Sequence, residues 1–347
     1  MKTSLATLGA LLVASTLAAC GSSTAAVDPS PSPTATSVAQ VEAPAPDPIT
    51  ITIASLKGPT TMGLVGLMDE VTEGTAAEDY QVTMYGSPDE VVPLVAQGGV
   101  DVALVPSNLA AVLYNKTKGT DAQISVMAVN TLGVLNIVES GETVQSMSDL
   151  AGKTIYSTGK GASPEYVLNY LLTEAGLTPG VDVTVEYLSE HTEVVAKLAT
   201  TPGSVGVLPQ PFVTIASAKS PDLRVALDLT EEWAAVSPDS QLINGVVVVR
   251  NAFAEENPEA IAQFLADYEA STEWVNANPA DAAPLIVDAG IVPDPALAEK
   301  AIPFCYITFV AGDQMKTSLS GYLQVLFDAD PKSVGGTMPG DDFYYGG

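Results

Sequence analysis

A chain of 347 residues is long enough for two domains or lobes that each bury a core. Apolar residues make up 47% of it and charged residues 16%, which indicates a globular rather than a disordered protein. Only 13 Lys and Arg stand against 41 Asp and Glu, and the formal net charge of −28 argues against nucleic acid as a partner and against charge-driven binding to anionic lipid.

The N-terminus predicts secretion. Lys2 precedes the apolar run "LATLGALLVASTLAAC" (5–20), which is short for a membrane span but typical of a signal peptide. Its end, "LAAC" (17–20), resembles the bacterial lipobox, in which a peptidase cleaves before the Cys and a diacylglyceryl group is attached to its thiol. An ordinary signal peptide would leave the position of Cys20 unexplained. We therefore expect a signal peptide at 1–19 and a lipid anchor at Cys20, which would hold the protein on the extracytoplasmic face of the cell membrane.

The next segment predicts a tether. Residues 20–48 are rich in Pro, Ser, Thr and Ala and show no apolar periodicity, as in flexible linkers. A lipidated Cys20 cannot pair with the other cysteine, Cys305, which lies in the apolar stretch "IPFCYITFV". We expect Cys305 to be a buried small hydrophobe. The folded part begins near Ile49.

From Ile49 onward, strand-like and helix-like runs alternate, which predicts parallel βαβ units. Ser87, Pro88 and Glu90 form the sequence pattern of a capping box at a helix start. The expected elements are strands at 49–56, 80–86 and 100–107 and helices at 60–71 and 87–99.

The same pattern recurs after a shift of 103 residues. The shift places Lys57-Gly58 on Lys160-Gly161, Thr60 on Ser163, Glu90 on Glu193 and Pro106 on Pro209. Because the order of strands and helices also matches, we predict two similar βαβαβ units.

The repeat bears on the stretch "KGPTT" (57–61), which is either a simple turn or a ligand-binding loop. In each unit a strand is followed by Lys-Gly and then by a hydroxyl residue at a helix start, with Ser163 expected as the second N-cap. Ligands of open α/β sheets bind at the carboxyl ends of strands, beside helix N-termini. Both loops are therefore expected to face one cleft, and two lysines there would favour a ligand with negative charge or strongly accepting oxygens.

Other polar residues follow strands in the same way. Ser107 and Asn108 end one strand and Gln210 ends its repeat equivalent, although Ser107 is equally compatible with a helix N-cap. The extended apolar runs 124–140 and 243–250 are expected to be the two crossing strands of a hinge. That would place Asn130 and Asn244 near the floor of the cleft.

The C-terminal part is predicted to be mainly helical. From Asn257 the apolar residues recur at helical spacing, as expected of a helix that packs on the core. The final Gly-rich segment (333–347) carries an aromatic trio that we expect to dock on the body.

The arrangement over 49–330 resembles the substrate-binding lipoproteins of ABC importers, and within them the nitrate/sulfonate/taurine group, which includes binders of thiamine-pyrimidine precursors. Segment 149–177 is similar to that family's "L-x-G-K-x-[IV]" motif, and "VGVLPQPFVTIA" (205–216) to its strand-end segment. The resemblance implies a type II periplasmic-binding-protein-like α/β fold, two βαβ lobes joined by two crossing strands. Lobe I would comprise 49–137 and 246–347, and lobe II 138–245.

The resemblance also implies a function. A monomeric receptor would close on a small polar or anionic organic solute, of the sulfonate, nitrate or pyrimidine-precursor class, and present it to an ABC permease and its ATPase. It would need no cofactor. Carried over by position, the family's ligand contacts are Lys57, Gly58, Pro59, Thr60, Thr61, Ser107, Asn108, Lys160, Gly161, Ala162, Ser163 and Gln210.

Catalytic motifs have little support. The chain's single histidine, His191, is expected to be a solvated residue at a helix start, and the sequence contains no H-E-x-x-H and no Cys/His cluster for zinc. "TGKGAS" (158–163) lacks the hydroxyl residue that a P-loop places after its Lys, and Pro164 replaces the last glycine of G-x-G-x-x-G. We expect no catalytic residue and no metal site. Two alternatives stay open: a lyase-like enzyme of the same bilobal fold, which the lipobox disfavours, and a solute-sensing lipoprotein.

Overall fold

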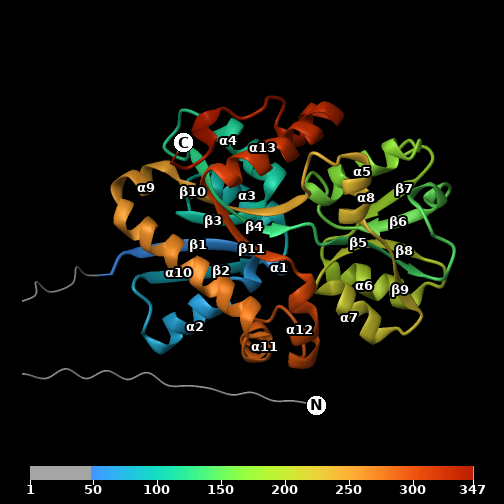
Figure 1. Ribbon diagram of the computed structural model, residues 1–347, viewed down its shortest axis with the longest axis horizontal. Coiled ribbons are helices and arrows are strands. Elements are labelled where there is room, and N and C mark those ends of the chain that lie inside the picture. Colours follow the sequence, from blue (N-terminus) through green and yellow to red (C-terminus); the bar gives the residue numbers. More distant parts are fainter. Residues whose placement is uncertain (1–47, 347) are drawn as a thin grey trace, which may run out of the picture. The chain divides into compact units, whose positions relative to one another are not determined.

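The computed structural model describes residues 48–346 (Figure 1). The predicted signal peptide, the lipid anchor at Cys20 and nearly all of the tether lie outside these residues. The described part is an α/β fold with a six-stranded and a five-stranded sheet. We call each sheet with its covering helices a lobe. No helix within 48–346 combines the length and the apolar character needed to cross a bilayer.

The first sheet has the order β11-β4-β10-β3-β1-β2. Strands β2, β1 and β3 are parallel to one another, and β10 joins β3 and β4 in antiparallel pairs, as does β11 with β4. Its strands are β1 (Thr50–Leu56), β2 (Asp79–Tyr85), β3 (Val102–Pro106), β4 (Ile124–Leu132), β10 (Ile243–Arg250) and β11 (Ile307–Ala311).

The second sheet has the order β7-β6-β8-β5-β9. Strands β7, β6 and β8 are parallel, and β5 pairs antiparallel with β8 and β9. Its strands are β5 (Leu135–Ser140), β6 (Thr154–Ser157), β7 (Thr184–Tyr187), β8 (Val205–Pro209) and β9 (Leu223–Asp228).

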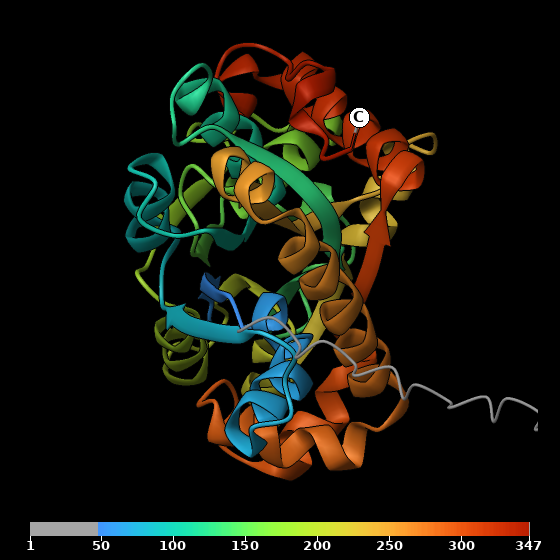
Figure 2. The same ribbon diagram turned by 90° about the vertical axis from the view of Figure 1, so that its left-hand side faces the viewer.

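Helices cover both faces of the first sheet because its strands bury side chains on both faces. In β1, Ile51 and Ile53 pack with α2 and α10, whereas Ala54 and Leu56 belong to the cluster that includes α3, α4 and α13. Figures 1 and 2 show α2 (blue) and α10 (orange) on one side of this sheet and α4 and α13 on the other. The helices are α1 (Pro59–Met62), α2 (Val65–Glu73), α3 (Pro88–Ala96), α4 (Ser107–Thr117), α5 (Ser163–Glu174), α6 (His191–Thr200), α7 (Phe212–Lys219), α8 (Leu229–Val236), α9 (Asn251–Glu256), α10 (Pro258–Ala277), α11 (Pro279–Asp288), α12 (Pro295–Ala301) and α13 (Gly312–Ala329).

The predicted repeat is confirmed by strand pairing. The order β2-β1-β3 in the first sheet corresponds to β7-β6-β8 in the second, and all four pairs are parallel. The helices between them correspond as well, because α3 and α6 both begin with a capping box. In α3 the box is the predicted one, with Ser87 as N-cap and Glu90 accepting from the Ser87 N–H group at 3.1 Å.

Two crossings link the sheets, and one differs from its predicted form. The run 124–140 crosses as expected, as β4 in the first sheet and β5 in the second. The run 243–250, by contrast, is strand β10 of the first sheet alone, and the second crossing runs through residues 237–242 between α8 and β10.

Helix starts account for most of the remaining differences. The expected helix 60–71 is interrupted between α1 and α2, where Gly63 packs so closely that a Cβ atom would lie 3.0 Å from Thr272 Oγ1. The N-cap role predicted for Ser163 is wrong, because Ala162 occupies that position and Ser163 is the first helical residue. The N-cap alternative for Ser107 is also wrong, since its hydroxyl donates to the carbonyl of Ile243 at 2.5 Å.

The expectations for the C-terminal part are confirmed. Ile261, Phe264 and Tyr268 of α10 are fully buried. Cys305 is buried too, with its Sγ atom 3.6 Å from Met62 Sδ. In the tail, Phe343 packs edge-on against Tyr114, with ring centroids 5.2 Å apart.

Candidate functional site

A cavity of about 70 Å³ lies between the two sheets, where the carboxyl ends of all six parallel strands meet. This is where open α/β folds bind ligands. This volume has room for a few water-sized groups, which favours a small solute. The cavity is lined by Leu56, Lys57, Pro59, Thr60, Gly86, Pro88, Pro106, Leu135, Thr158, Gly159, Ala162, Pro164, Ser189, His191, Pro209 and Asn244.

The lining follows the repeat. Residues at the same shift of 103 face the cavity from opposite lobes: Gly86 opposite Ser189, and Pro106 opposite Pro209. Because the two βαβαβ units present the same strand ends, a single cavity receives two copies of the same loops.

The loop after β1 brings Lys57 to the cavity. Lys57 directly follows the last residue of the strand, and its N–H group donates to Tyr85 O at 2.8 Å. Gly58 has φ +140°, a conformation that L side chains rarely adopt, and this lets α1 start at Pro59.

The hydroxyls of the same loop are used internally. Thr60 Oγ1 and Thr61 Oγ1 both donate to the carbonyl of Leu56, at 2.9 and 2.6 Å. Thr60 still lines the cavity, whereas Thr61 is fully buried beneath it against Ser55. Thr60 therefore offers a solute an acceptor oxygen rather than a free donor.

Lys160, the repeat equivalent of Lys57, does not line the cavity. Strand β6 ends at Ser157, three positions before Lys160, and the glycines on either side of Lys160, Gly159 and Gly161, both adopt positive φ. The side chain is exposed and borders a neighbouring surface groove instead. The condition behind the expected anionic ligand, two lysines in one cleft, is thus not met.

Four further predicted residues join the lobes to each other. Asn108 Nδ2 donates to Gly161 O at 3.3 Å, and Ser163 Oγ donates to Asn108 Oδ1 at 3.2 Å. Ser107 Oγ lies 3.4 Å from Ser163 Oγ. Ser107, Asn108 and Ser163 are fully buried and absent from the lining, so they form a polar bridge between the first turns of α4 and α5.

Of the remaining predicted residues, some line the cavity and others are buried behind its wall. Ala162 and Asn244 line the cavity. Asn130 lies behind the lining, and Gly245 permits this packing because a Cβ atom there would lie 2.6 Å from Asn130 Oδ1. Gln210 is buried and accepts from the Thr214 hydroxyl at 2.9 Å.

Asn244 presents an unused acceptor. Its Oδ1 atom is buried and has no hydrogen-bond partner among residues 48–346. A buried polar atom without a partner is unusual and calls for an explanation. This buried oxygen is out of reach of a solute, so Nδ2 is the polar atom that Asn244 offers at the wall of the cavity.

Sequence reasoning missed His191, Thr158 and Ser189. The sequence predicts a solvated His191, but its ring packs against Phe212, with centroids 4.6 Å apart, and its Nδ1 atom lies 2.9 Å from Thr158 Oγ1. Burial lowers the pKa of His191 to about 4, so the imidazole is neutral at pH 7. The repeat held a usable signal, since the shift of 103 places Pro88, which lines the cavity, on His191.

Residues 63–284 match a protein family described as the periplasmic substrate-binding protein of phosphonate ABC transporters. No curated protein is significantly similar to this chain in sequence. Among residues 48–346, no three His, Cys, Asp or Glu side chains are grouped so that they could hold a metal ion.

Solved structures share the fold. An ABC transporter protein from Parabacteroides distasonis is 24% identical, with a TM-score of 0.68 over 85% of this chain and 98% of its own. The alkanesulfonate-binding protein SsuA from Xanthomonas axonopodis pv. citri, bound to MOPS, is 16% identical, with a TM-score of 0.64 over 82% and 94%. The nitrate-binding protein NrtA from Synechocystis PCC 6803 is 12% identical, with a TM-score of 0.60 over 84% and 85%. The fold is that of type II periplasmic binding proteins.

Proposed function

We propose that this chain holds a small polar solute in the cavity between its lobes and delivers it to a permease. The premise is that the chain belongs to the phosphonate family of periplasmic substrate-binding proteins of ABC transporters. The observation that carries the proposal is the convergence of six strand ends on one cavity. Lys57 and the amide of Asn244 line this cavity and can bind the oxygens of a solute. The sulfonate and nitrate binding of its structural neighbours is consistent with a small oxygen-rich solute.

A thermal-shift screen tests solute binding. The panel contains sulfonates, nitrate, bicarbonate, phosphonates and pyrimidine or flavin precursors. A true ligand at about 100 times its Kd stabilises the native state by roughly 2.7 kcal/mol. Absence of a shift with every compound would contradict the proposal.

Closure of the lobes on the solute is part of the proposal. The polar bridge between Asn108 and the Gly161–Ser163 turn supports it, because bonds between buried groups of two lobes exist only while the lobes are together. X-ray scattering should show a smaller radius of gyration with the best compound of the screen than without it. Identical profiles at saturation would remove closure from the mechanism.

We also propose that the mature protein is a monomer, anchored through Cys20 by the tether 20–48. The lobe boundaries proposed follow the two sheets, 49–132 with 243–346 for lobe I and 135–236 for lobe II, in place of the predicted boundaries at 137/138 and 245/246. Cys20→Ser should release the protein into the medium or leave the precursor uncleaved. Unchanged partitioning into the detergent phase would contradict the anchor.

We assign the chain transport rather than catalysis or sensing. The His191 imidazole at the cavity contacts the Thr158 hydroxyl, and within the described residues no carboxylate is hydrogen-bonded to it that would orient it as a general base. Solute uptake through a permease that requires this protein would support transport rather than sensing.

A further inference from the structure

The cavity is poor in backbone donors. Five of the residues that line it are prolines, which have no N–H group: Pro59, Pro88, Pro106, Pro164 and Pro209. Three of them, Pro59, Pro88 and Pro164, stand at the starts of α1, α3 and α5. Helix starts bind anions through free N–H groups, and here prolines replace some of those groups.

Two glutamates accept hydrogen bonds from backbone N–H groups at the cavity. Gly86 N donates to Glu90 at 3.1 Å, and Ser189 N, its repeat equivalent, donates to Glu193 at 2.8 Å. Gly86 and Ser189 both line the cavity. Each of these N–H groups is therefore already used by a carboxylate of the chain, and that carboxylate repels negative charge nearby.

Positive charge is limited to one side chain. Lys57 is the only Lys or Arg among the residues that line the cavity, and none of the ion pairs within residues 48–346 involves it. The neutral imidazole of His191 adds no charge. Lys57 can compensate one negative charge of a solute. A second would stay uncompensated in a chain of net charge −28.

The amide of Asn244 adds a neutral donor. Asn244 lines the cavity, but its Oδ1 atom is buried out of reach of a solute, so Nδ2 is the polar atom that this side chain offers. A neutral N–H group can bind an oxygen of the solute without compensating its charge, so Lys57 alone supplies positive charge from the lining.

This inference rests on the proposed function: we infer that the cavity selects a small solute that carries at most one negative charge. It discriminates against dianions, including the phosphonate dianion. Lys57 takes the single charge or an acceptor atom of the solute, the amide of Asn244 donates to an oxygen, and the prolines and Leu56 and Leu135 contact its apolar surface.

Calorimetry with three tetrahedral sulfur compounds tests this inference. Sulfate (charge −2), methanesulfonate (−1) and methanesulfonamide (neutral, with N–H donors) differ mainly in charge, and methylphosphonate at pH 8.5 adds a phosphorus dianion. At low ionic strength we expect sulfate and methylphosphonate to bind at least tenfold more weakly than the better of the other two.

A charge-removal variant locates the cause. In Glu90→Gln/Glu193→Gln, glutamine still supports the capping boxes, so the helices keep their starts. We expect the discrimination against sulfate to fall at least fivefold. The matched control Glu259→Gln/Glu273→Gln removes two exposed carboxylates of α10 and should leave it unchanged. Equal effects in both variants would overturn the inference.

The outcomes separate the two proposals. If sulfate or methylphosphonate binds most tightly, the inference is wrong and solute binding stands. If neither these probes nor any compound of the thermal-shift screen binds, the proposed function fails and the inference falls with it.

Discussion

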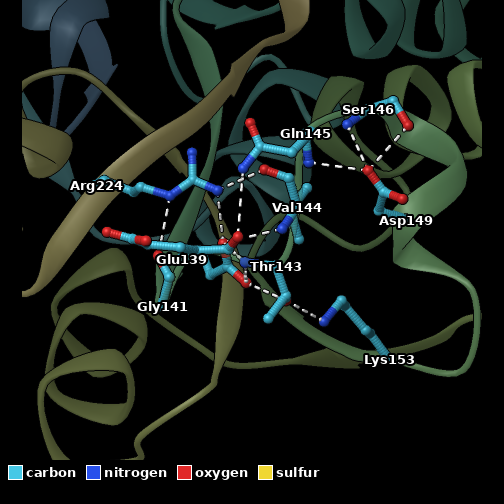
Figure 3. Close-up of polar contacts among 10 residues, drawn as sticks. Glu139, Gly141, Thr143, Val144, Gln145, Ser146, Asp149, Lys153 and Arg224 are labelled. Carbon is cyan, nitrogen blue, oxygen red and sulfur yellow. Dashed lines mark hydrogen bonds and ion pairs between the residues drawn. The ribbon is translucent and has the colours of Figure 1, made fainter.

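Two polar regions of this protein, the surroundings of Glu139 and the cavity between the lobes, differ in whether their polar groups find partners within the chain. Around Glu139, in the second lobe, the buried carboxylate accepts hydrogen bonds from Thr143 N, Val144 N and the Thr143 hydroxyl, and it pairs with Arg224 at 2.8 Å (Figure 3). In the cavity, by contrast, Asn244 Oδ1 has no partner within residues 48–346 and Lys57 forms none of the ion pairs there.

This difference in internal partners indicates which polar groups stabilise the fold and which bind a solute. Figure 3 shows Arg224 bridging Glu139 to the carbonyls of Gly141 and Val144, so that one ion pair fixes the turn after β5. Each polar group there has its partners within the chain, so removing one should lower the free energy of unfolding. Groups in the cavity are satisfied by a solute, and removing one should weaken binding instead.

The largest expected effect is on the satisfied region. Glu139→Gln removes a fully buried charge and leaves Arg224 without its counterion, which should cost about 3 kcal/mol of unfolding free energy. At 2–4 °C per kcal/mol, the melting temperature should fall by roughly 6–12 °C. Differential scanning calorimetry measures the change, and the affinity for the best probe should stay within about twofold.

The same variant has a signature in acid. Burial alone would raise the pKa of Glu139, but hydrogen bonds from Thr143, Val144 and Arg224 outweigh it and hold the pKa below the ordinary 4.5. Because the folded-state pKa is depressed, this stabilisation is present above pH 4.5 and is lost as the pH falls through the folded-state value. Glu139→Gln should lack that loss, while Glu142→Gln, at an exposed neighbouring position, should resemble the wild type. A parallel pH profile in Glu139→Gln would contradict the assignment.

The comparison of the two lysines gives the next largest effect. Lys57→Ala should weaken methanesulfonate binding tenfold or more, about 1.4 kcal/mol, because it removes the one Lys or Arg that lines the cavity within residues 48–346. Lys160→Ala changes an exposed residue outside the lining and should alter the affinity less than about twofold. Titration calorimetry on both variants decides. Equal losses would show that the two repeat loops contribute alike.

These lysines also show how far the sequence predicts the site. The repeat and the strand order indicate which ends converge, and Lys57 follows β1 without an intervening residue. That Lys160 turns away depends on β6 ending at Ser157 and on two left-handed glycines, details of a few residues that periodicity does not resolve. Likewise, nothing in the pattern shows whether a hydroxyl such as that of Thr61 faces a ligand or bonds its own backbone.

The smallest expected effect is on the pH dependence of stability and comes from His191, a residue that lines the cavity. Burial lowers its pKa to about 4 from the ordinary 6.5, so the folded state stays neutral where the unfolded chain takes up a proton. Stability should therefore fall as the pH drops below 6.5 and stop falling from this cause near pH 4.

Because this is the chain's single histidine, its contribution can be isolated by subtraction. We expect it to be about 1 kcal/mol between pH 7 and pH 5, less than the full linkage, since the ring keeps some contact with solvent. His191→Gln keeps a polar atom for the Thr158 hydroxyl and carries no titrating ring. The loss of melting temperature from pH 7 to 5 should be roughly 2–4 °C smaller in the variant than in the wild type. Carboxylates that titrate in the same range act on both proteins and cancel in the difference. An identical loss in both would mean that the imidazole is as solvated as its position in the sequence implied, and would remove it from the wall of the cavity.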